Sequence, residues 1–495
     1  MRLRDVWDVV VVGGGAAGSV VARRIAEETS ASILLLEAGP ALDDETVRSL
    51  GDGWRLPTVP DWGYESEPDA TGTTNRLRRG RLLGGTSWLT RFAVRGAAAD
   101  FDAWGTTVNA NWSFIDVLPW FRRLETDLDF SDRPWHGDSG PIPITRYRDL
   151  ARSTIHVSAL EAWSAAGFPV VDDHNAPDAI GAGPMPMSSR LGARITTLDA
   201  YLAAEARPES LTLRTECLVS SVVLAGGRAA GVRLADGTRI RAQRVILSAG
   251  TYGSPPILMR SGIGPGAHLH ELGIKPVVEL PGVGANLADH PAVDLDCGWR
   301  GEGSAGPILH SIATFRSSVA GPDGAPDLMF WLTDPEAADP AFYLDPILLK
   351  PVSRGTVGLR SADPEDAPRI TLPGLTEEVD LARLVEGYER AVDLANRPEI
   401  RRLTSESAPS LPADRSELRR RVIDNAYSLP HVVGTCRMGP PTDVGAVVDH
   451  RGRVHGVDGL YVIDASIIPD APAGFPHVIT IMAAERISAQ LAANA

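Results

Sequence analysis

The sequence predicts an α/β fold in two domains, the larger of which is assembled from segments far apart in the chain. At 495 residues the chain exceeds the size at which one hydrophobic core usually stops growing. It opens with a strand, a glycine-rich turn, a helix and a second strand, a pattern typical of a parallel sheet with crossover helices. Two further apolar strands follow much later, at residues 245–249 and 459–465. If these strands complete the same sheet, the intervening segments form the second domain.

The first strand and the turn after it predict a phosphate site. Residues 8–12 are Asp-Val-Val-Val-Val, a β-branched run typical of a parallel strand buried on both faces. The turn Gly13-Gly14-Gly15-Ala16-Ala17-Gly18 has the G-x-G-x-x-G spacing, and residues 19–28 then carry apolar side chains at helical spacing. Such a turn lets the backbone approach a pyrophosphate closely and presents the positive end of the helix to it.

The second strand ends in an acid that completes this pattern. Residues 33–36 are apolar, and Glu37 lies 19 residues beyond Gly18, where an acid accepts hydrogen bonds from ribose hydroxyls. Strand, turn, helix and acid together predict a dinucleotide site. Both NAD and FAD are bound by this motif, so the choice between them depends on residues elsewhere.

The composition argues against several classes of function. With 43% hydrophobic and 22% charged residues, the chain matches ordinary globular proteins. A formal net charge of -15, without runs of Lys and Arg, argues against a nucleic-acid partner. The three cysteines are far apart, so neither a disulfide framework nor a metal site is expected. The apolar run at residues 9–12 is too short for a signal peptide or a membrane span. We therefore expect a cytoplasmic protein that holds no metal.

Four further segments combine small residues with apolar runs. They are residues 80–104, which begin Gly80-Arg81-Leu82-Leu83-Gly84-Gly85-Thr86-Ser87, and residues 250–264, 281–291 and 431–466. In this order they resemble the glucose-methanol-choline (GMC) oxidoreductases, which are flavoenzymes, over nearly the whole chain. The resemblance implies FAD as the dinucleotide. It also implies the GMC fold, a Rossmann-like FAD-binding domain assembled from discontinuous segments plus a substrate-binding domain with a β-sheet and helices.

The domain boundaries follow from the positions of these segments. We expect the FAD-binding domain to comprise residues 1–140, 190–292 and 425–495. The substrate-binding domain then comprises residues 141–189 and 293–424, in keeping with ordinary domain sizes.

The resemblance assigns FAD contacts to individual residues. The segment Gly84 to Ser87 would lie against the isoalloxazine and the pyrophosphate, and Val219 would meet the adenine through its backbone. Asp464 and Ala465 would hold the ribityl and phosphate region. The full set of expected FAD residues is Gly13, Gly15, Ala16, Ala17, Gly18, Glu37, Ala38, Arg81, Gly84, Gly85, Thr86, Ser87, Val219, Ala249, Gly250, Asp464, Ala465, His477 and Val478.

Two histidines are the expected catalytic residues. Alcohol oxidation requires a base for the hydroxyl proton, and a histidine of ordinary pKa, about 6.5, is available as neutral imidazole near pH 7. In the family, the histidine at the place of His431 takes that proton, and a His or Asn at the place of His477 orients the alcohol and stabilises the alkoxide. The flavin accepts the hydride. For His290, in the third segment, a structural role is favoured.

The chain departs from the family pattern at two places. After Gly85 it continues Thr86-Ser87-Trp88-Leu89-Thr90, without the histidine through which some relatives link FAD covalently, so we expect non-covalent FAD. Phe475 stands where relatives commonly have Asn. Its ring could line the substrate pocket, or it could be a substitution that affects packing alone. The aromatic surface of Trp88 would also suit a substrate ring.

These observations predict an FAD-dependent oxidoreductase that converts the CH–OH group of an alcohol to a carbonyl. A sugar, glycoside, polyol or aryl or alkyl alcohol fits the polar and aromatic residues of the second domain, including Trp331 and Phe342, and choline is not favoured. Oxygen or another acceptor would reoxidise the flavin. The sequence leaves open the alcohol, whether it is primary or secondary, the acceptor and the oligomeric state. The alternatives are a flavin-containing hydroxynitrile lyase of the same fold and a flavoprotein without turnover.

Overall fold

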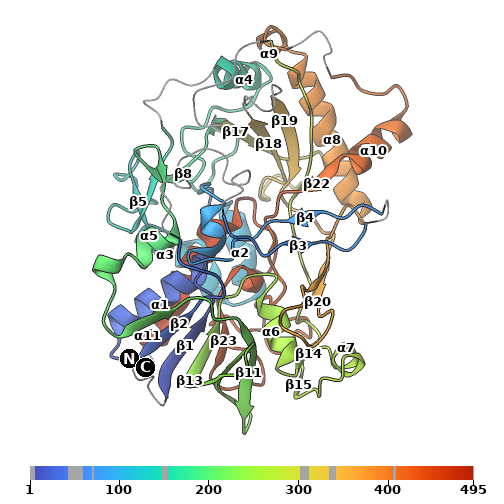
Figure 1. Ribbon diagram of the computed structural model, residues 1–495. Helices are drawn as coiled ribbons and strands as arrows, with labels where there is room; N and C mark the ends of the chain where they lie inside the picture. The colour runs from blue at the N-terminus through green and yellow to red at the C-terminus, as the bar shows by residue number, and fades with distance from the viewer. Residues whose placement is uncertain are drawn as a thin grey trace.

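Two large sheets organise the molecule. The computed structural model describes residues 6–42, 59–69, 72–147, 154–300, 311–333, 342–404 and 409–493. In Figure 1 a seven-stranded sheet lies at the bottom of the molecule and a six-stranded sheet at the top. This is the α/β architecture that the sequence predicts.

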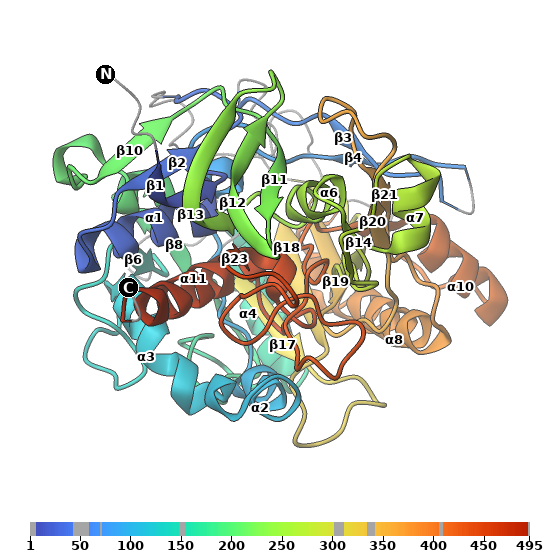
Figure 2. The ribbon, with the colours of Figure 1, turned by 90° about the horizontal axis from the view of Figure 1, so that it is seen from below.

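The seven-stranded sheet joins both ends of the chain. Its path runs β10 (Leu211–Arg214), β2 (Ile33–Leu36), β1 (Trp7–Val12), β13 (Arg239–Leu247), β12 (Arg228–Leu234) and β11 (Val219–Ala225), and β23 (Leu460–Val462) also pairs with β13. β1 pairs in parallel with both β2 and β13, so Val10 lies opposite Leu34 on one side and Val245 on the other. A strand covered on both faces must be apolar throughout, which explains the valine run. Strands predicted from distant segments therefore share one sheet, as expected (Figure 2).

Two helices that cover this sheet begin earlier than their periodicity predicts. α1 (Ala16–Glu28) starts directly after the glycine turn, with Gly15 as its N-cap. α11 (Pro476–Ala492) starts at a proline, whose missing N–H costs no hydrogen bond in the first turn of a helix. The two helices pack against each other, and α11 also contacts α3 (Phe114–Leu124).

The six-stranded sheet is built from the second half of the chain and one earlier strand. Its order is β22 (Ala426–Ser428), β16 (Pro291–Val293), β19 (Tyr343–Leu348), β18 (Leu328–Thr333), β17 (Ser311–Phe315) and β7 (Ala182–Pro184), and its pairs are antiparallel. Four helices lie near it in the upper part of Figure 1: α4 (Thr154–Ala165), α8 (Glu378–Ala395), α9 (Pro398–Arg401) and α10 (Arg415–Asp424). Phe330 of the sheet, Leu384 of α8 and Trp163 of α4 share its buried core.

Smaller elements complete the described part of the fold. A four-stranded sheet contains β5 (Glu125–Asp127), β6 (Ile142–Thr145), β8 (Met187–Arg190) and β9 (Ala193–Arg194). Three two-stranded sheets pair β3 (Tyr64–Glu65) with β4 (Arg76–Leu77), β14 (Ile263–Gly264) with β15 (Val278–Glu279), and β20 (Thr356–Gly358) with β21 (Arg369–Thr371). The remaining helices are α2 (Ala98–Thr107), α5 (Thr197–Tyr201), α6 (Ser254–Arg260) and α7 (Gly266–Glu271), with short 3-10 turns that include Gly85–Trp88 and Ala465–Ile467.

The strand pairs bear on the proposed domain boundaries. β22 begins at Ala426, just after the expected boundary at residue 425, yet it pairs with β16 in the upper sheet. β16 itself spans the expected boundary at residue 292. The division into an FAD-binding and a substrate-binding domain remains a proposal, with both junctions close to the point where the two sheets meet.

The described part of the chain contains no helix that is both long and apolar enough to cross a bilayer. Its three cysteines, Cys217, Cys297 and Cys436, are buried and unpaired as thiols.

Candidate active site

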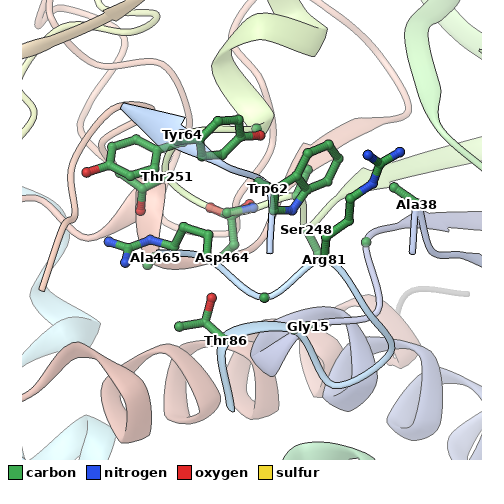
Figure 3. Close-up of a pocket in the computed structure, with 18 of the residues that line it drawn as sticks. Gly15, Ala38, Trp62, Tyr64, Arg81, Thr86, Ser248, Thr251, Asp464 and Ala465 are labelled. Atoms are coloured by element: carbon green, nitrogen blue, oxygen red, sulfur yellow. The ribbon is translucent and has the colours of Figure 1, made fainter. Parts of the chain in front are cut away.

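One long cavity gathers most of the residues that the sequence singled out. Residues at or just after the ends of β1, β2, β13 and β23 line it. In Figure 3, Trp62 and Tyr64 lie on the opposite side from Gly15 and Thr86. The expected FAD residues that line the cavity are Gly13, Gly15, Ala16, Ala17, Glu37, Ala38, Arg81, Gly85, Thr86, Val219, Ala249, Gly250, Asp464, Ala465 and His477. Gly18, Gly84, Ser87 and Val478 lie behind this lining.

The three motif glycines of the turn are needed for different structural reasons. At Gly13 φ is +98°, and an added Cβ would lie 2.4 Å from the carbonyl oxygen of Ser248. At Gly18 an added Cβ would lie 1.8 Å from the carbonyl oxygen of Gly13, so this glycine lets α1 pack on the strand. Gly15 faces the cavity, where the nearest atom to an added Cβ is the Cα of Gly85 at 3.9 Å. No side chain in the described part of the chain caps α1, so its first amides remain available to a phosphate.

The carboxylate of Glu37 is hydrogen-bonded to the backbone of this turn and of the segment after β2. Its Oε2 accepts a hydrogen bond from the Gly14 amide at 2.8 Å, and its Oε1 accepts one from the Gly39 amide at 2.9 Å. Burial raises the pKa of Glu37 to about 6, against the lowering effect of these amides. Each carboxylate oxygen keeps a second lone pair, so the side chain can accept ribose hydroxyls at the cavity.

A second glycine pair packs backbone to backbone on the first turn. The Gly84 amide donates to the Gly14 carbonyl at 2.8 Å, and Gly85 has φ +52° with an added Cβ only 2.8 Å from the Gly15 Cα. Ser87 Oγ donates to the Gly84 carbonyl at 2.6 Å. Gly84 and Ser87 therefore shape the turn that places Gly85 and Thr86 on the cavity wall.

The expectation that Trp88 faces a substrate is wrong. Its ring is fully buried against Val59 and Leu82, and Nε1 donates to the Leu83 carbonyl at 2.8 Å. The 3-10 turn Gly85–Trp88 directs Thr86 to the cavity and Trp88 into the core.

The carboxylate of Asp464, which follows β23, forms hydrogen bonds with the segment after β13. One carboxylate oxygen accepts from the Gly250 amide at 2.9 Å and from Ser254 Oγ at 2.6 Å, and the other accepts from the Ser466 amide at 2.8 Å. Burial raises the pKa of Asp464 above its ordinary value. Gly250 has φ +80° with open space beside its Cα, so ligand atoms can approach the backbone closely there.

His431 and His477 line the same cavity. His431 follows β22, and His477 is the second residue of α11. Desolvation lowers the pKa of His431 well below its ordinary value, and His290 and Arg79 lower it further. Desolvation, with a smaller effect of Arg194, lowers the pKa of His477 to about 4. Both imidazoles are therefore neutral at neutral pH.

The ring of Phe475 stands beside His431. Their centroids are 4.7 Å apart, and Phe475 packs in turn on Trp331 at 5.6 Å and Phe92 at 5.7 Å. Phe475 lines the cavity, which agrees with the first of its two interpretations. Phe342 does not belong to this group, because it packs against Trp299 in the core of the six-stranded sheet.

The cavity has an aromatic and cationic rim, of which only Arg81 was predicted. Trp62 stacks on Tyr64 at 5.6 Å, and Tyr64 meets Tyr252 edge-on at 5.9 Å. Arg81 lies over Trp62 at 4.8 Å, as Figure 3 shows, and Arg79 lies over Tyr252 at 5.0 Å. Arg79 lies directly before the first family-like segment, and Tyr252 lies within the second. Their positions could therefore have indicated that they belong to the site. Trp62 and Tyr64 lie in no motif.

One group among the described residues has metal-ligand spacing, Glu125, Asp127 and His136. Arg146 donates to both oxygens of Asp127 at 2.9 and 3.0 Å, and Arg95 pairs with Glu125. Because cationic side chains already occupy these carboxylates, the group is an internal ion cluster.

Comparisons with known proteins agree with this geometry. Two family models described as GMC oxidoreductase match residues 7–292 and 351–484. The chain is 34% identical to 5-(hydroxymethyl)furfural oxidase of Methylovorus sp., over 92% of this chain and 93% of that protein. It is 32% identical to oxygen-dependent choline dehydrogenase of Pseudomonas savastanoi, over 92% and 88%. Pyridoxine 4-oxidase from Mesorbium loti has a similar structure, with TM-score 0.91, 30% identity and coverage of 98% and 99%.

Proposed function

Because the chain belongs to the GMC oxidoreductase family, we propose that its substrate is an alcohol attached to a flat, uncharged ring, with His431 as the base and His477 as its partner. The enzyme is an FAD-dependent oxidoreductase that converts the CH–OH group of an alcohol to a carbonyl. One observation carries the assignment of roles: the two neutral histidines face the same cavity as the dinucleotide cradle.

The proposed reaction needs a neutral base beside the hydroxyl. His431 takes the hydroxyl proton, and His477 donates a hydrogen bond to the oxygen as it gains alkoxide character. Bound FAD supplies the hydride acceptor. Gly15, Gly250 and the uncapped start of α1 would hold its phosphates, and Glu37 its ribose. Oxygen or another acceptor would then take the electrons.

The surroundings of His431 support the ring-bearing substrate. Phe475 offers an aromatic face, and Pro430, Pro476 and Thr90 also line the cavity. Such a wall has little to offer the many hydroxyls of a sugar, but it favours stacking with a flat ring. One relative is named for a hydroxymethyl group on a furfural ring. Among the substrate classes considered, an aryl-type alcohol fits best.

Substitution of His431 tests the role of the base. His431→Ala should lower kcat about 10²- to 10⁴-fold, the usual contribution of a general base, while the protein retains FAD. His455→Ala is the matched control, because His455 lies outside this cavity with its Nε2 beside the Gly439 carbonyl. Wild-type turnover in His431→Ala would contradict the assignment.

A spectroscopic experiment separates oxidation from the lyase alternative. Anaerobic addition of a ring-bearing alcohol should bleach the yellow flavin absorbance, whereas a lyase would stay yellow. The relatives compared above are oxidases and a dehydrogenase, so the lyase is not favoured. Repeating the successful alcohols under air then identifies whether oxygen is an acceptor.

FAD is proposed to be non-covalent. The segment Thr86 to Thr90 offers no histidine for a covalent link. Acid precipitation should therefore release the yellow colour into the supernatant, and colour that stays with the pellet would contradict the proposal.

The cytoplasm remains the proposed location, supported by three buried thiols without disulfide partners. Cell fractionation tests it. The proposed partners are the alcohol and the electron acceptor, and the net charge of -15 argues against nucleic acid.

A further inference from the structure

A second histidine contacts the ring of the proposed base. His290 Nδ1 lies 3.1 Å from His431 Nδ1, a hydrogen-bond distance, although the two residues are 141 positions apart. The rings meet edge to face, at 83° with centroids 5.3 Å apart. His290 is fully buried and does not line the cavity, so it cannot contact the substrate.

This contact couples the tautomer of His431 to that of His290. A neutral imidazole carries one proton, so in a bond between two Nδ1 atoms one ring donates and the other accepts. If His431 accepts, its proton sits on Nε2 and it cannot take a proton there. We propose that His290 is a positioning residue that accepts the Nδ1–H of His431 and so keeps His431 Nε2 bare for the substrate. This inference rests on the proposed function.

The surroundings of His290 are compatible with this arrangement. The backbone carbonyls of Pro472 and Leu349 stabilise positive charge on its buried ring. Nε2 of His290 has no hydrogen-bond partner among the described residues, so a proton placed on Nε2 leaves Nδ1 as the nitrogen that accepts from His431.

Desolvation, aided by nearby cations, keeps both rings neutral. Desolvation, with Lys350, lowers the pKa of His290 to about 4, while Asp470 acts in the opposite direction. Lys350 is itself paired with Asp100 at 2.8 Å and Asp470 at 3.3 Å. For His431, the facing charged group is Arg79, which also disfavours the imidazolium.

Asp289 holds the two histidines at this separation. Its Oδ1 accepts the amide N–H of His290 at 2.8 Å and that of His431 at 2.7 Å, and its Oδ2 accepts from Ser428 Oγ. One carboxylate thus fixes the backbones of both residues. The two backbones cannot separate without breaking these bonds.

The proton balance of the step is simple. The hydroxyl proton moves to His431 Nε2, which leaves the alkoxide and an imidazolium. The imidazolium still donates its Nδ1–H to His290, so the charge is stabilised by a hydrogen bond and His290 gains no proton. His431 later releases the proton from Nε2.

The tautomer is measurable without turnover. In the holoenzyme labelled with ¹⁵N-histidine, NMR distinguishes protonated from bare ring nitrogens, and His431→Ala identifies the signals of His431. We expect a protonated Nδ1 and a bare Nε2 at mildly alkaline pH. A protonated Nε2 in the wild type would overturn the proposal, whatever the variants do.

Two substitutions of His290 then link the tautomer to catalysis. His290→Leu removes the acceptor and should lower kcat about 10²-fold or more with little change in KM, since a wrong tautomer disables the base. His290→Asn keeps an amide oxygen that can accept from Nδ1–H and should restore most of the activity. Equal losses in both variants, with an unchanged tautomer, would show a purely structural role and overturn the proposal.

His174→Leu is the matched control. His174 is also buried, with a pKa lowered to about 4, and it does not line the cavity. It should keep wild-type kcat and the wild-type tautomer of His431. Failure of every alcohol to bleach the wild-type flavin would refute the proposed function instead, and the NMR result would stand apart from it.

Discussion

Two shielded histidines in this protein have pKa values shifted in opposite directions, and their partners explain the difference. His136 places Nδ1 2.7 Å from Glu125 and 3.0 Å from Asp127, and Nε2 2.9 Å from Asp173. Desolvation opposes its charge, but these carboxylates raise its pKa above the ordinary value. The ring of His431 contacts a neutral histidine, and its pKa falls. Burial alone therefore does not determine protonation, because a carboxylate on each nitrogen outweighs desolvation.

The surroundings of His136 and those of His431 have different roles in the protein. The His136 cluster joins the segment before α2 to the strands β5 and β6 and to the loop before β7, through Arg95, Glu125, Arg146 and Asp173. It is a fully paired, charged anchor between segments. No carboxylate among the described residues forms an ion pair with the His431 ring, and the lowered pKa keeps a ring nitrogen unprotonated.

The largest effect on stability is expected from breaking the charged anchor. Arg146→Met leaves Asp127 and Asp173 buried without their main cation and should lower the free energy of unfolding by about 3–5 kcal/mol. Urea unfolding measures it. Arg419→Ala breaks an exposed pair with Glu378, where solvent screens the charges, and should have little effect on the free energy of unfolding. Equal losses in the two variants would contradict the distinction.

A smaller, pH-dependent effect is expected from His136→Gln. Because the folded pKa of His136 is raised, its contribution is fully present below the unfolded pKa of about 6.5 and is lost as pH rises through the folded value. The variant should lose about 1–3 kcal/mol at mildly acidic pH and progressively less at alkaline pH. A loss that grows with pH would refute the assigned charge.

The site histidines should show the opposite pH dependence. The folded pKa of His477 is about 4, so the unfolded chain binds more protons below about pH 6.5 and their contribution to stability falls as pH decreases towards 4. For the same reason kcat/KM should not halve near pH 6.5, because His431 stays neutral there. A pH profile measured on enzyme of unchanged FAD content checks this prediction.

The smallest effect is expected from Arg79. Its charge lowers the pKa of His431, after desolvation and His290. Arg79→Gln should therefore move the acid limb of the kcat/KM profile to higher pH, by less than about one unit for a partly exposed charge. An acid limb that moves to lower pH would contradict this electrostatic role.

Site residues that lie in contiguous motifs could be predicted from the sequence, whereas residues outside such motifs could not. Gly13, Glu37 and Asp464 were expected from contiguous motifs, and all three line the cavity. Trp62 and Tyr64 line it as well, but they lie in a short strand region without periodicity or motif. Trp88 shows the reverse error, since its place in a motif did not reveal that the 3-10 turn directs its ring into the core.

By itself, the sequence determined the parallel sheet, the dinucleotide turn and the family, and it singled out His431 and His477, which line one cavity. These features are local, because valine runs, glycine spacing and motif order are written in consecutive residues. The tertiary structure decided which side chains meet: His290 with His431, and His136 with carboxylates from two distant segments. The charge of a histidine depends on such contacts across the fold, and no local pattern encodes them.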